Sequence, residues 1–466
     1  MSSTSALNSL LSSSSSSTLD LSSILEAAFG ASSSGIDVTA AVNAGVTAAE
    51  APEQSWLTEE STLQSQTTAL QQLQTDATSL DTDMQSLNSL TGPLSARTVT
   101  SSNSNIVTAS ASSGATLGNH VVVVNSLATT DTWTSGVFAN ATTALPAGSI
   151  TLTTGTGTAT VTTDGTTTLT DVANSINGDN LGVTASVVTD ATGARLAIVA
   201  NTSGSAANFS VTSPQLASFG FTQSAGVNAS LTVDGIAIQS ATNTVTNAVP
   251  GLTLNLLSAV PGTQVSLGVS PDTSQASTAI NQFVTDYNAI ITAVNAQFSD
   301  SGSGQGALAT DPNMRNLQSE LEGALSYTAT NATGKISSLA SYGVSVNSDG
   351  TLSVDSSALS SALQNNFSDV QNFFQGSALN GFANSLDQQL SNFTNPANGA
   401  FTIDLQSIST EYSTLQTDVT NFQNNVITPL KAQLQSEYSK AEIALQQLPT
   451  EMKQIQQELG YNSSNG

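Results

Sequence analysis

The residue pattern that comes closest to a metal site begins at Ser345. In the register of an EF-hand calcium loop, Asn347, Asp349 and Gly350 stand at the third, fifth and sixth positions. Such a loop also needs a carboxylate at its first position and a bidentate glutamate at its last. This chain has serine at both, Ser345 and Ser356. We therefore predict no metal site here.

The same stretch has the pattern of a tight hairpin. Residues 344–346 and 352–354 alternate apolar and polar side chains, as strands with one buried face do. The turn between them needs Gly350, because glycine adopts a positive φ without steric cost. We predict that Asp355 then caps a helix that begins at Ser356.

Other residues that could do chemistry lack the partners that the chemistry needs. Asp300–Gly302 matches the aspartic-protease tripeptide, but that reaction needs two carboxyl groups that share a proton, and the chain has no second copy. Gly334–Lys335 resembles a phosphate loop without its Ser or Thr. His120 is the single histidine, and Asp81 and Asp83 are predicted to lie on a solvated helix face. The sequence thus predicts no catalytic residue, no cofactor and no metal, although carboxylate chemistry stays open.

Composition and charge exclude several classes of partner. Only 9% of the 466 residues are charged, and the formal net charge is −26. The seven basic residues are spread along the chain, so no basic patch can follow a phosphate backbone. We therefore predict that neither nucleic acid nor a membrane is a partner. Cysteine is absent, which excludes disulfides and thiol nucleophiles.

The first part of the chain does not have the pattern of a secretory signal. Such a signal needs a basic region before an apolar core, and the first basic residue is Arg97. The apolar runs are too short to span a bilayer. The sequence alone leaves two possibilities open, a cytoplasmic protein or one exported by a route that reads no such signal.

Heptad spacing marks two segments, one toward each end of the chain. Apolar residues that recur every seven residues, with a second series three residues later, are typical of helices wound around each other. The first seam comprises Trp56, Leu63, Leu70, Leu73, Ala77, Leu80, Met84 and Leu87. The second seam comprises Leu405, Ile408, Tyr412, Leu415, Val419 and Phe422. Since neither helix can bury its seam alone, we predict that the two pair with each other or with other copies.

The ends of these helices can also be predicted. Gly92-Pro93 should end the first one. In the second, the spacing shifts phase between 426 and 441, which locally unwinds a supercoil. Pro429 and Pro449 are expected to kink or break it, because proline removes a helix hydrogen bond.

Between the two seams the pattern is mostly that of strands. From Arg97 to Pro271, short alternating runs rich in Thr and Val are separated by turn pairs such as Asp164-Gly165 and Asp234-Gly235. One helix is expected near 170–176, capped by Thr170 or Asp171. Helical spacing returns at 276–298, 314–325 and 356–374.

These segments predict an α+β, multidomain protein in which helices at both ends flank a β-rich head of two domains. We expect a disordered Ser-rich tail at 1–34, an N-terminal leg helix at 35–95 and the β-rich head at 96–275. A mixed α/β core of helices and a hairpin should follow at 276–400, and a C-terminal leg helix at 401–466.

Several motifs, in this order along the chain, resemble one family. They are Ser34–Asp37, Leu169–Asn177, Asn243–Leu254, Gln282–Asn288 and Gly306–Asp311, followed by the hairpin at 344–354. Flanked by the two heptad helices, they resemble the bacterial flagellar filament-cap proteins, also called the flagellar hook-associated protein 2 family.

The resemblance implies a function. Proteins of this family form a ring at the growing filament tip that retains exported flagellin and promotes its folding and insertion. Implied partners are other copies of the chain, flagellin, the hook–filament junction proteins and an export chaperone. The resemblance also implies contact of the two seams with the filament or with other copies. It implies an extracellular place at the flagellar tip, reached through the flagellar export channel without a cleaved signal peptide, and no enzymatic activity.

In this family the C-terminal helix binds the export chaperone. The resemblance therefore implies the chaperone contact at Leu445, Leu448, Met452, Ile455 and Leu459.

Three alternatives stay open on the sequence alone. Flagellin and the hook–filament junction proteins also have helical ends around a β-rich middle. A surface adhesin would bind a glycan through the β-rich region without a flagellum. An enzyme that uses carboxylates such as Asp300 is the third.

Overall fold

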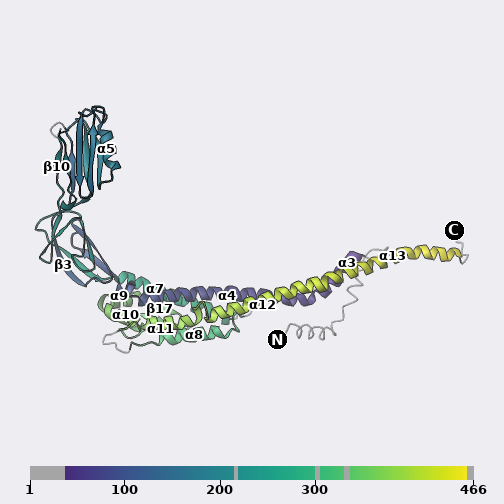
Figure 1. Ribbon diagram of the computed structural model, residues 1–466. Helices are drawn as coiled ribbons and strands as arrows, with labels where there is room; N and C mark the ends of the chain where they lie inside the picture. Colours follow the sequence, from purple (N-terminus) through teal and green to yellow (C-terminus); the bar gives the residue numbers. More distant parts are fainter. Residues whose placement is uncertain (1–36, 215–218, 300–304, 330–335, 459–466) are drawn as a thin grey trace.

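The structure, a computed structural model, describes residues 37–214, 219–299, 305–329 and 336–458. It is strongly elongated (Figure 1). Long helices form a rod, shorter helices pack against one half of that rod, and two β-rich domains follow one another beyond it. Four separate hydrophobic clusters fill these parts, so the molecule has several small cores in a row.

The rod begins with α3 (Val38–Ala49) and α4 (Ala51–Asn88). Asp37 caps α3, since its carboxylate accepts a hydrogen bond from the Ala40 amide at 2.9 Å. The expected end near Gly92-Pro93 is present: α4 stops at Asn88 and a short 3-10 turn, η2 (Pro93–Ser95), leads into the first strand.

The rod is completed by the returning chain. Helix α12 (Ala400–Phe422) packs along α4, a five-residue π-helical stretch (Gln423–Ile427) follows, and α13 (Thr428–Glu458) packs along α3. We call α3, α4, α12 and α13 the leg. The π stretch, with its wider turn, lies where the apolar spacing of the sequence begins to shift phase.

The helix does not break at Pro449, because α13 continues through it. The π stretch ends at Ile427, two residues before Pro429, so the irregularity lies close to this proline.

Shorter helices form the helical core against the C-terminal half of α4. They are α7 (Thr273–Phe298), α8 (Pro312–Leu325), α9 (Ser356–Asn365), α10 (Phe367–Gln375) and α11 (Phe382–Thr394). The turn η4 (Leu339–Tyr342) and the hairpin of β16 (Val344–Val346) and β17 (Leu352–Val354) complete it. Its centre is a cluster of rings in edge and stacked contact: Phe283, Tyr342, Phe373, Phe374 and Phe382.

Two expectations for this region need correction. The helix expected over 356–374 is interrupted at Asn366, whose φ of −138° and ψ of 37° do not fit a helix. Helix α11 was not predicted at all, although Phe382, Leu386 and Phe393 on its inner face are buried.

The inner domain of the head has two antiparallel sheets around one core. The larger sheet has the order β1 (Arg97–Ser101), β15 (Val265–Pro271), β3 (Gly118–Ser126), β11 (Ala229–Val233), β12 (Ile236–Ser240). The smaller has the order β13 (Thr244–Thr246), β14 (Leu252–Leu256), β2 (Val107–Ala111). Strands β1 and β15 pair side by side, Arg97 opposite Pro271, so the chain enters and leaves the head at one place.

The outer domain is inserted between β3 and β11. One sheet has the order β10 (Thr222–Ser224), β4 (Thr130–Thr134), β8 (Gly193–Ser203), β7 (Val183–Asp190). The other has the order β6 (Gly157–Thr163), β5 (Gly148–Thr154), β9 (Ser210–Thr212). Helix α5 (Leu169–Gly178) and the short turn η3 (Ser205–Ala207) belong to the same domain.

The cap of α5 differs from the expectation. Thr168 is the cap, because its extended backbone lets its hydroxyl accept from the Asp171 amide, while the Asp171 carboxylate accepts from the Thr168 amide at 2.9 Å. The fold class predicted from the sequence, helices at both ends around a β-rich head of two domains, is confirmed.

Candidate functional site

The loop at Ser345 is a hairpin turn. Strands β16 and β17 pair in register, and Gly350 in the turn has a φ of +82°. The Asp349 carboxylate accepts hydrogen bonds from the Thr351 amide and hydroxyl at 3.0 and 2.6 Å, which lowers the pKa of Asp349. Asp355 caps α9, as predicted. The part of the chain that the structure describes holds no group of three or more acidic or histidine side chains placed to bind a metal.

His120 has a structural partner. Its Nδ1 lies 2.8 Å from the Asp234 carboxylate, which also accepts from the Val121 amide at 2.8 Å. These two hydrogen bonds, His120 first, lower the pKa of Asp234. This hydrogen-bonded pair holds the β11–β12 turn against β3. The other two motifs weighed above, Asp300–Gly302 and Gly334–Lys335, lie outside the described residues.

Asp81 and Asp83 are not on a solvated face, which corrects the expectation from the sequence. Both are partly buried, and each faces another aspartate from a neighbouring helix, Asp387 on α11 or Asp286 on α7. Burial first, then the partner carboxyl, raises the pKa of both Asp81 and Asp83 to about 7.

The first seam divides into two parts. Its residues from Leu63 to Leu87 are buried, and those from Leu70 onward belong to the helical core. Helices α7, α11 and α12 of the same chain cover this half of α4, so these side chains are not free for another molecule. Trp56, nearer the other end of α4, is only partly buried.

The second seam lies on α12 and is half covered. Each of its six residues is partly buried, with α4 on one side. The contact is made by rings and amides: Trp56 and Phe422 meet edge to face with centroids 5.3 Å apart, and Gln64 donates to the Tyr412 hydroxyl at 2.8 Å. Gln416 donates to Glu60 at 3.2 Å.

A small separate hydrophobic cluster joins α3 to the returning chain at the π stretch. Val42 and Val46 of α3 pack with Ile427, and Gln423 donates to the Glu53 carboxylate. Toward its C-terminal end, most side chains of α13 are exposed. This end of α13 forms the far end of the rod (Figure 1).

The free end of α13 carries an exposed apolar stripe. Leu445, Leu448, Met452 and Ile455 are each about half exposed, at 43–54%. With Pro449 and Lys453, the first three line a shallow cavity of about 340 Å³. The fifth residue proposed for this surface, Leu459, lies outside the described residues.

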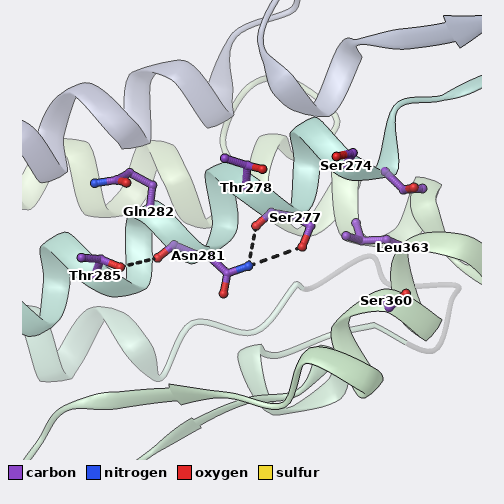
Figure 2. A pocket seen from close by; sticks show the side chains of 9 residues that line it. Ser274, Ser277, Thr278, Asn281, Gln282, Thr285, Ser360 and Leu363 are labelled. Carbon is purple, nitrogen blue, oxygen red and sulfur yellow. Dashed lines mark hydrogen bonds between the residues drawn. The ribbon is translucent and has the colours of Figure 1, made fainter.

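A polar groove of about 490 Å³ lies between the first half of α7 and α9 (Figure 2). It is lined by Thr273, Ser274, Ser277, Thr278, Asn281, Gln282, Thr285, Ser360 and Leu363. Asn281 donates to the Ser277 carbonyl at 2.8 Å, and Thr285 donates to the Asn281 carbonyl at 2.9 Å, so α7 itself uses much of this hydrogen-bonding capacity. The lining has no charged side chain and offers no pair of acid and base.

Sequence reasoning missed this groove. The signal was present in the repetition of short polar residues every fourth position from 273 to 285, which places them on one face of a helix.

The arrangement of leg and head resembles a solved flagellar cap structure. The D1-D2-D3 domains of the flagellar cap protein FliD from Escherichia coli align with a TM-score of 0.59 and 26% sequence identity, over 73% of this chain and 99% of that one. A β-rich head of two domains on a helical leg is thus the fold of a flagellar cap.

Sequence relatives and family models agree. The B-type flagellar hook-associated protein 2 of Pseudomonas aeruginosa is 28% identical over 373 residues, 72% of this chain and 77% of that protein. The flagellar hook-associated protein 2 of Aeromonas caviae is 26% identical over 445 residues, 88% of this chain and 94% of that protein.

The family models for the flagellar hook-associated protein 2 N-terminus and C-terminus match residues 34–131 and 226–450, and the flagellin hook IN motif matches residues 149–202 in the outer domain. This chain belongs to the flagellar hook-associated protein 2 family, and its role is that of a flagellar filament cap. The family is a structural one, known for no enzymatic activity. None of the helices in the described residues is long and apolar enough to cross a membrane.

Proposed function

We propose that this protein forms a ring of identical copies at the growing filament tip, where it retains exported flagellin and promotes its folding and insertion. The observation that carries the proposal is the half-covered face of α12. Helix α12 packs along α4, and its Leu415 and Val419 are only partly buried. Such a face can add a second helical partner, from flagellin or from another copy, without unfolding the leg.

The separation of cores supports a division of labour between leg and head. The leg and the helical core share no hydrophobic cluster with the two head domains. The leg can therefore shift against the filament as each subunit inserts, while the head keeps its own packing and covers the opening. The hook–filament junction proteins are the partners proposed for the leg before the first flagellin is added.

The exposed stripe of α13 is the surface proposed for the export chaperone. A row of apolar residues on one helix face suits the groove of a helical partner. On this proposal the chaperone covers the stripe before export, the chain leaves through the flagellar channel without cleavage, and the stripe becomes free at the tip.

The first test is the place of the protein on intact cells. Immunogold labelling should put gold at the filament tips. Gold along the shaft would assign a filament subunit instead, and gold on the cell body without flagella would favour an adhesin.

A second test asks whether the half-covered face of α12 is needed for capping. Leu415→Asp with Val419→Asp should leave export intact and release flagellin into the medium, because the cap no longer holds the filament. Thr414→Asp with Thr417→Asp, on the exposed side of the same helix, is the matched control. Normal filaments in the first variant would contradict the role of this face.

For the chaperone, Leu448→Asp with Met452→Asp should lower the amount of exported protein. Gln447→Asp with Thr450→Asp keeps the same added charge away from the stripe and should export normally. Equal export of both variants would reject the stripe as the chaperone contact.

A further inference from the structure

Two pairs of aspartates face each other where the C-terminal half of α4 packs into the helical core. Asp81 on α4 meets Asp387 on α11, and Asp83 on α4 meets Asp286 on α7. All four side chains are partly buried. One short segment of α4 thus carries a carboxyl group toward each of two neighbouring helices, and each meets another carboxyl group.

The first pair has too few hydrogen-bond donors when both groups are ionised. Gln85 donates to both carboxylates, to Asp81 Oδ2 at 3.2 Å and to Asp387 Oδ1 at 3.1 Å. The other oxygen of Asp81, Oδ1, is buried and receives no donor. An ionised carboxylate can only accept, so a proton on one of the two carboxyl groups would supply the missing donor.

The second pair has the same shortage. Gln282 donates to Asp286 Oδ1 at 3.0 Å, and Asp83 Oδ2 is buried without a donor. Protonation of one member gives a hydrogen bond between the two carboxyl groups and removes the repulsion between like charges.

Among the residues that the structure describes, no basic side chain acts on either pair. On the elements that pack against this half of α4, α12 carries Asp404, which faces Asn313 and Asp311, and α10 carries Asp369 in its first turn. The turn η2 has no titratable residue. The group that acts on Asp81 is Asp387, and the group that acts on Asp83 is Asp286.

We propose that these two pairs form a proton-held clamp: one proton within each pair fastens α4 to α11 and to α7, and loss of both protons loosens this end of the leg. The clamp lies within about two turns of Asn88, where α4 ends and the chain turns toward the head. The stiffness of the connection between leg and head therefore depends on pH.

The direction follows from the raised pKa values. Burial and the partner carboxyl raise the pKa of Asp81 and of Asp83 from 3.8 to about 7 in the folded chain. A raised pKa means that the folded state holds protons that the unfolded state releases. The stabilisation is complete below about pH 4 and is lost as the pH rises to about 7 and above.

The test uses the full chain and its two tryptophans, Trp56 in the leg and Trp133 in the outer domain. We call the leg and the helical core together the helical part. In a Trp133→Phe background, fluorescence of Trp56 reports urea unfolding of the helical part. Between pH 5 and pH 7 the unfolding equilibrium constant should rise severalfold per pH unit, against a limit of about tenfold for each proton released. Asparagine supplies an amide donor in place of the proton, so Asp81→Asn with Asp83→Asn should remove this rise.

The control is Asp418→Asn, which neutralises an exposed carboxylate of α12 and should keep the rise. If the first double variant does not fold, Asp387→Asn with Asp286→Asn makes the same replacement from the other two helices. Equal stability of the unsubstituted chain at pH 5 and pH 8, or a rise that persists in a folded double variant, would overturn the clamp.

Discussion

Acidic side chains in the Thr-rich turns of the head and on helix α4 have opposite surroundings. In the outer domain, Asp164 accepts hydrogen bonds from the amides and hydroxyls of Thr166 and Thr167 at 2.7–3.1 Å, and these bonds lower its pKa. In the helical part, Asp81 and Asp387 meet from distant points of the chain and the pKa of Asp81 rises. A carboxylate in a Thr-rich turn finds donors within three residues, whereas one on a helix face depends on what the neighbouring helix presents.

The difference extends to packing. In the head, hairpins such as β5–β6 and β7–β8 join strands that are close in sequence, whereas β1 and β15 pair across the whole head. Each of its two domains has a core of its own. The helical part depends on contacts such as that of α4 with α11, which the chain forms only after the whole head has been made. The two regions should therefore respond differently to substitution and to pH, and the two tryptophans can follow them separately.

The largest expected effect is a loss of packing in the helical core. Phe283 is fully buried and touches the rings of Tyr287, Phe374 and Phe382. Phe283→Ala should lower the free energy of unfolding of the helical part by about 3–5 kcal/mol. Urea unfolding followed by Trp56 should shift, and that followed by Trp133 should not.

The matched control is Phe283→Leu, which keeps most of the buried volume and should cost less. If Trp133 reported the same loss as Trp56, the two regions would unfold as one unit, and the comparison between them would fail.

The next largest effect is expected at a buried aspartate of the outer domain whose hydrogen-bond donors are distant in sequence. Asp131 is completely buried and accepts from the Phe209 amide at 2.8 Å and from the Gln223 side chain at 3.1 Å, both distant in sequence. Asp131→Ala should destabilise the outer domain by about 1–3 kcal/mol, because it leaves a buried amide without an acceptor. Trp133 fluorescence in urea measures it, and Asp131→Asn, which keeps one acceptor oxygen, should lose less.

A smaller effect is expected in the leg. The edge-to-face pair of Trp56 and Phe422 joins α4 to α12 near the π stretch. A double-mutant cycle with Trp56→Leu and Phe422→Leu should give a coupling energy of about 0.5–1.5 kcal/mol. Helical circular dichroism in urea is the measurement, since the two variants with Trp56→Leu lack the fluorescent probe. Strict additivity of the two substitutions would show that the rings contribute only by their area.

The smallest expected effect is on the acid unfolding of the head. Asp164 should lose its stabilisation as the pH falls, whereas Asp81 and Asp83 should lose theirs as the pH rises. The pKa of Asp164 is lowered below 3.8, so the stability that it contributes is present above about pH 4 and is lost as the pH falls below that value. Acid unfolding of the head, followed by Trp133, should become less steep in Asp164→Asn. An unchanged acid transition would show that the local hydrogen bonds of this turn do not stabilise the fold.

Much of the architecture was readable from the sequence, because local patterns specify local structure. Heptad spacing predicted the leg helices, alternation and Asp-Gly pairs predicted the β-rich head, and Gly350 with Asp355 predicted the hairpin and the cap that follows it. In each case the residues that determine the element lie within a few turns of one another, so their spacing carries the information.

What the sequence could not decide was which surfaces meet. Heptad spacing does not say that Leu70 and Leu80 are covered by helices of the same chain, while Leu415 keeps an exposed side. It does not say that Asp81 faces Asp387 and not water. These are contacts between segments separated by the whole head, and only the tertiary structure brings them together, because burial and a carboxyl neighbour are properties of the packed interface and not of the helix that carries the residue.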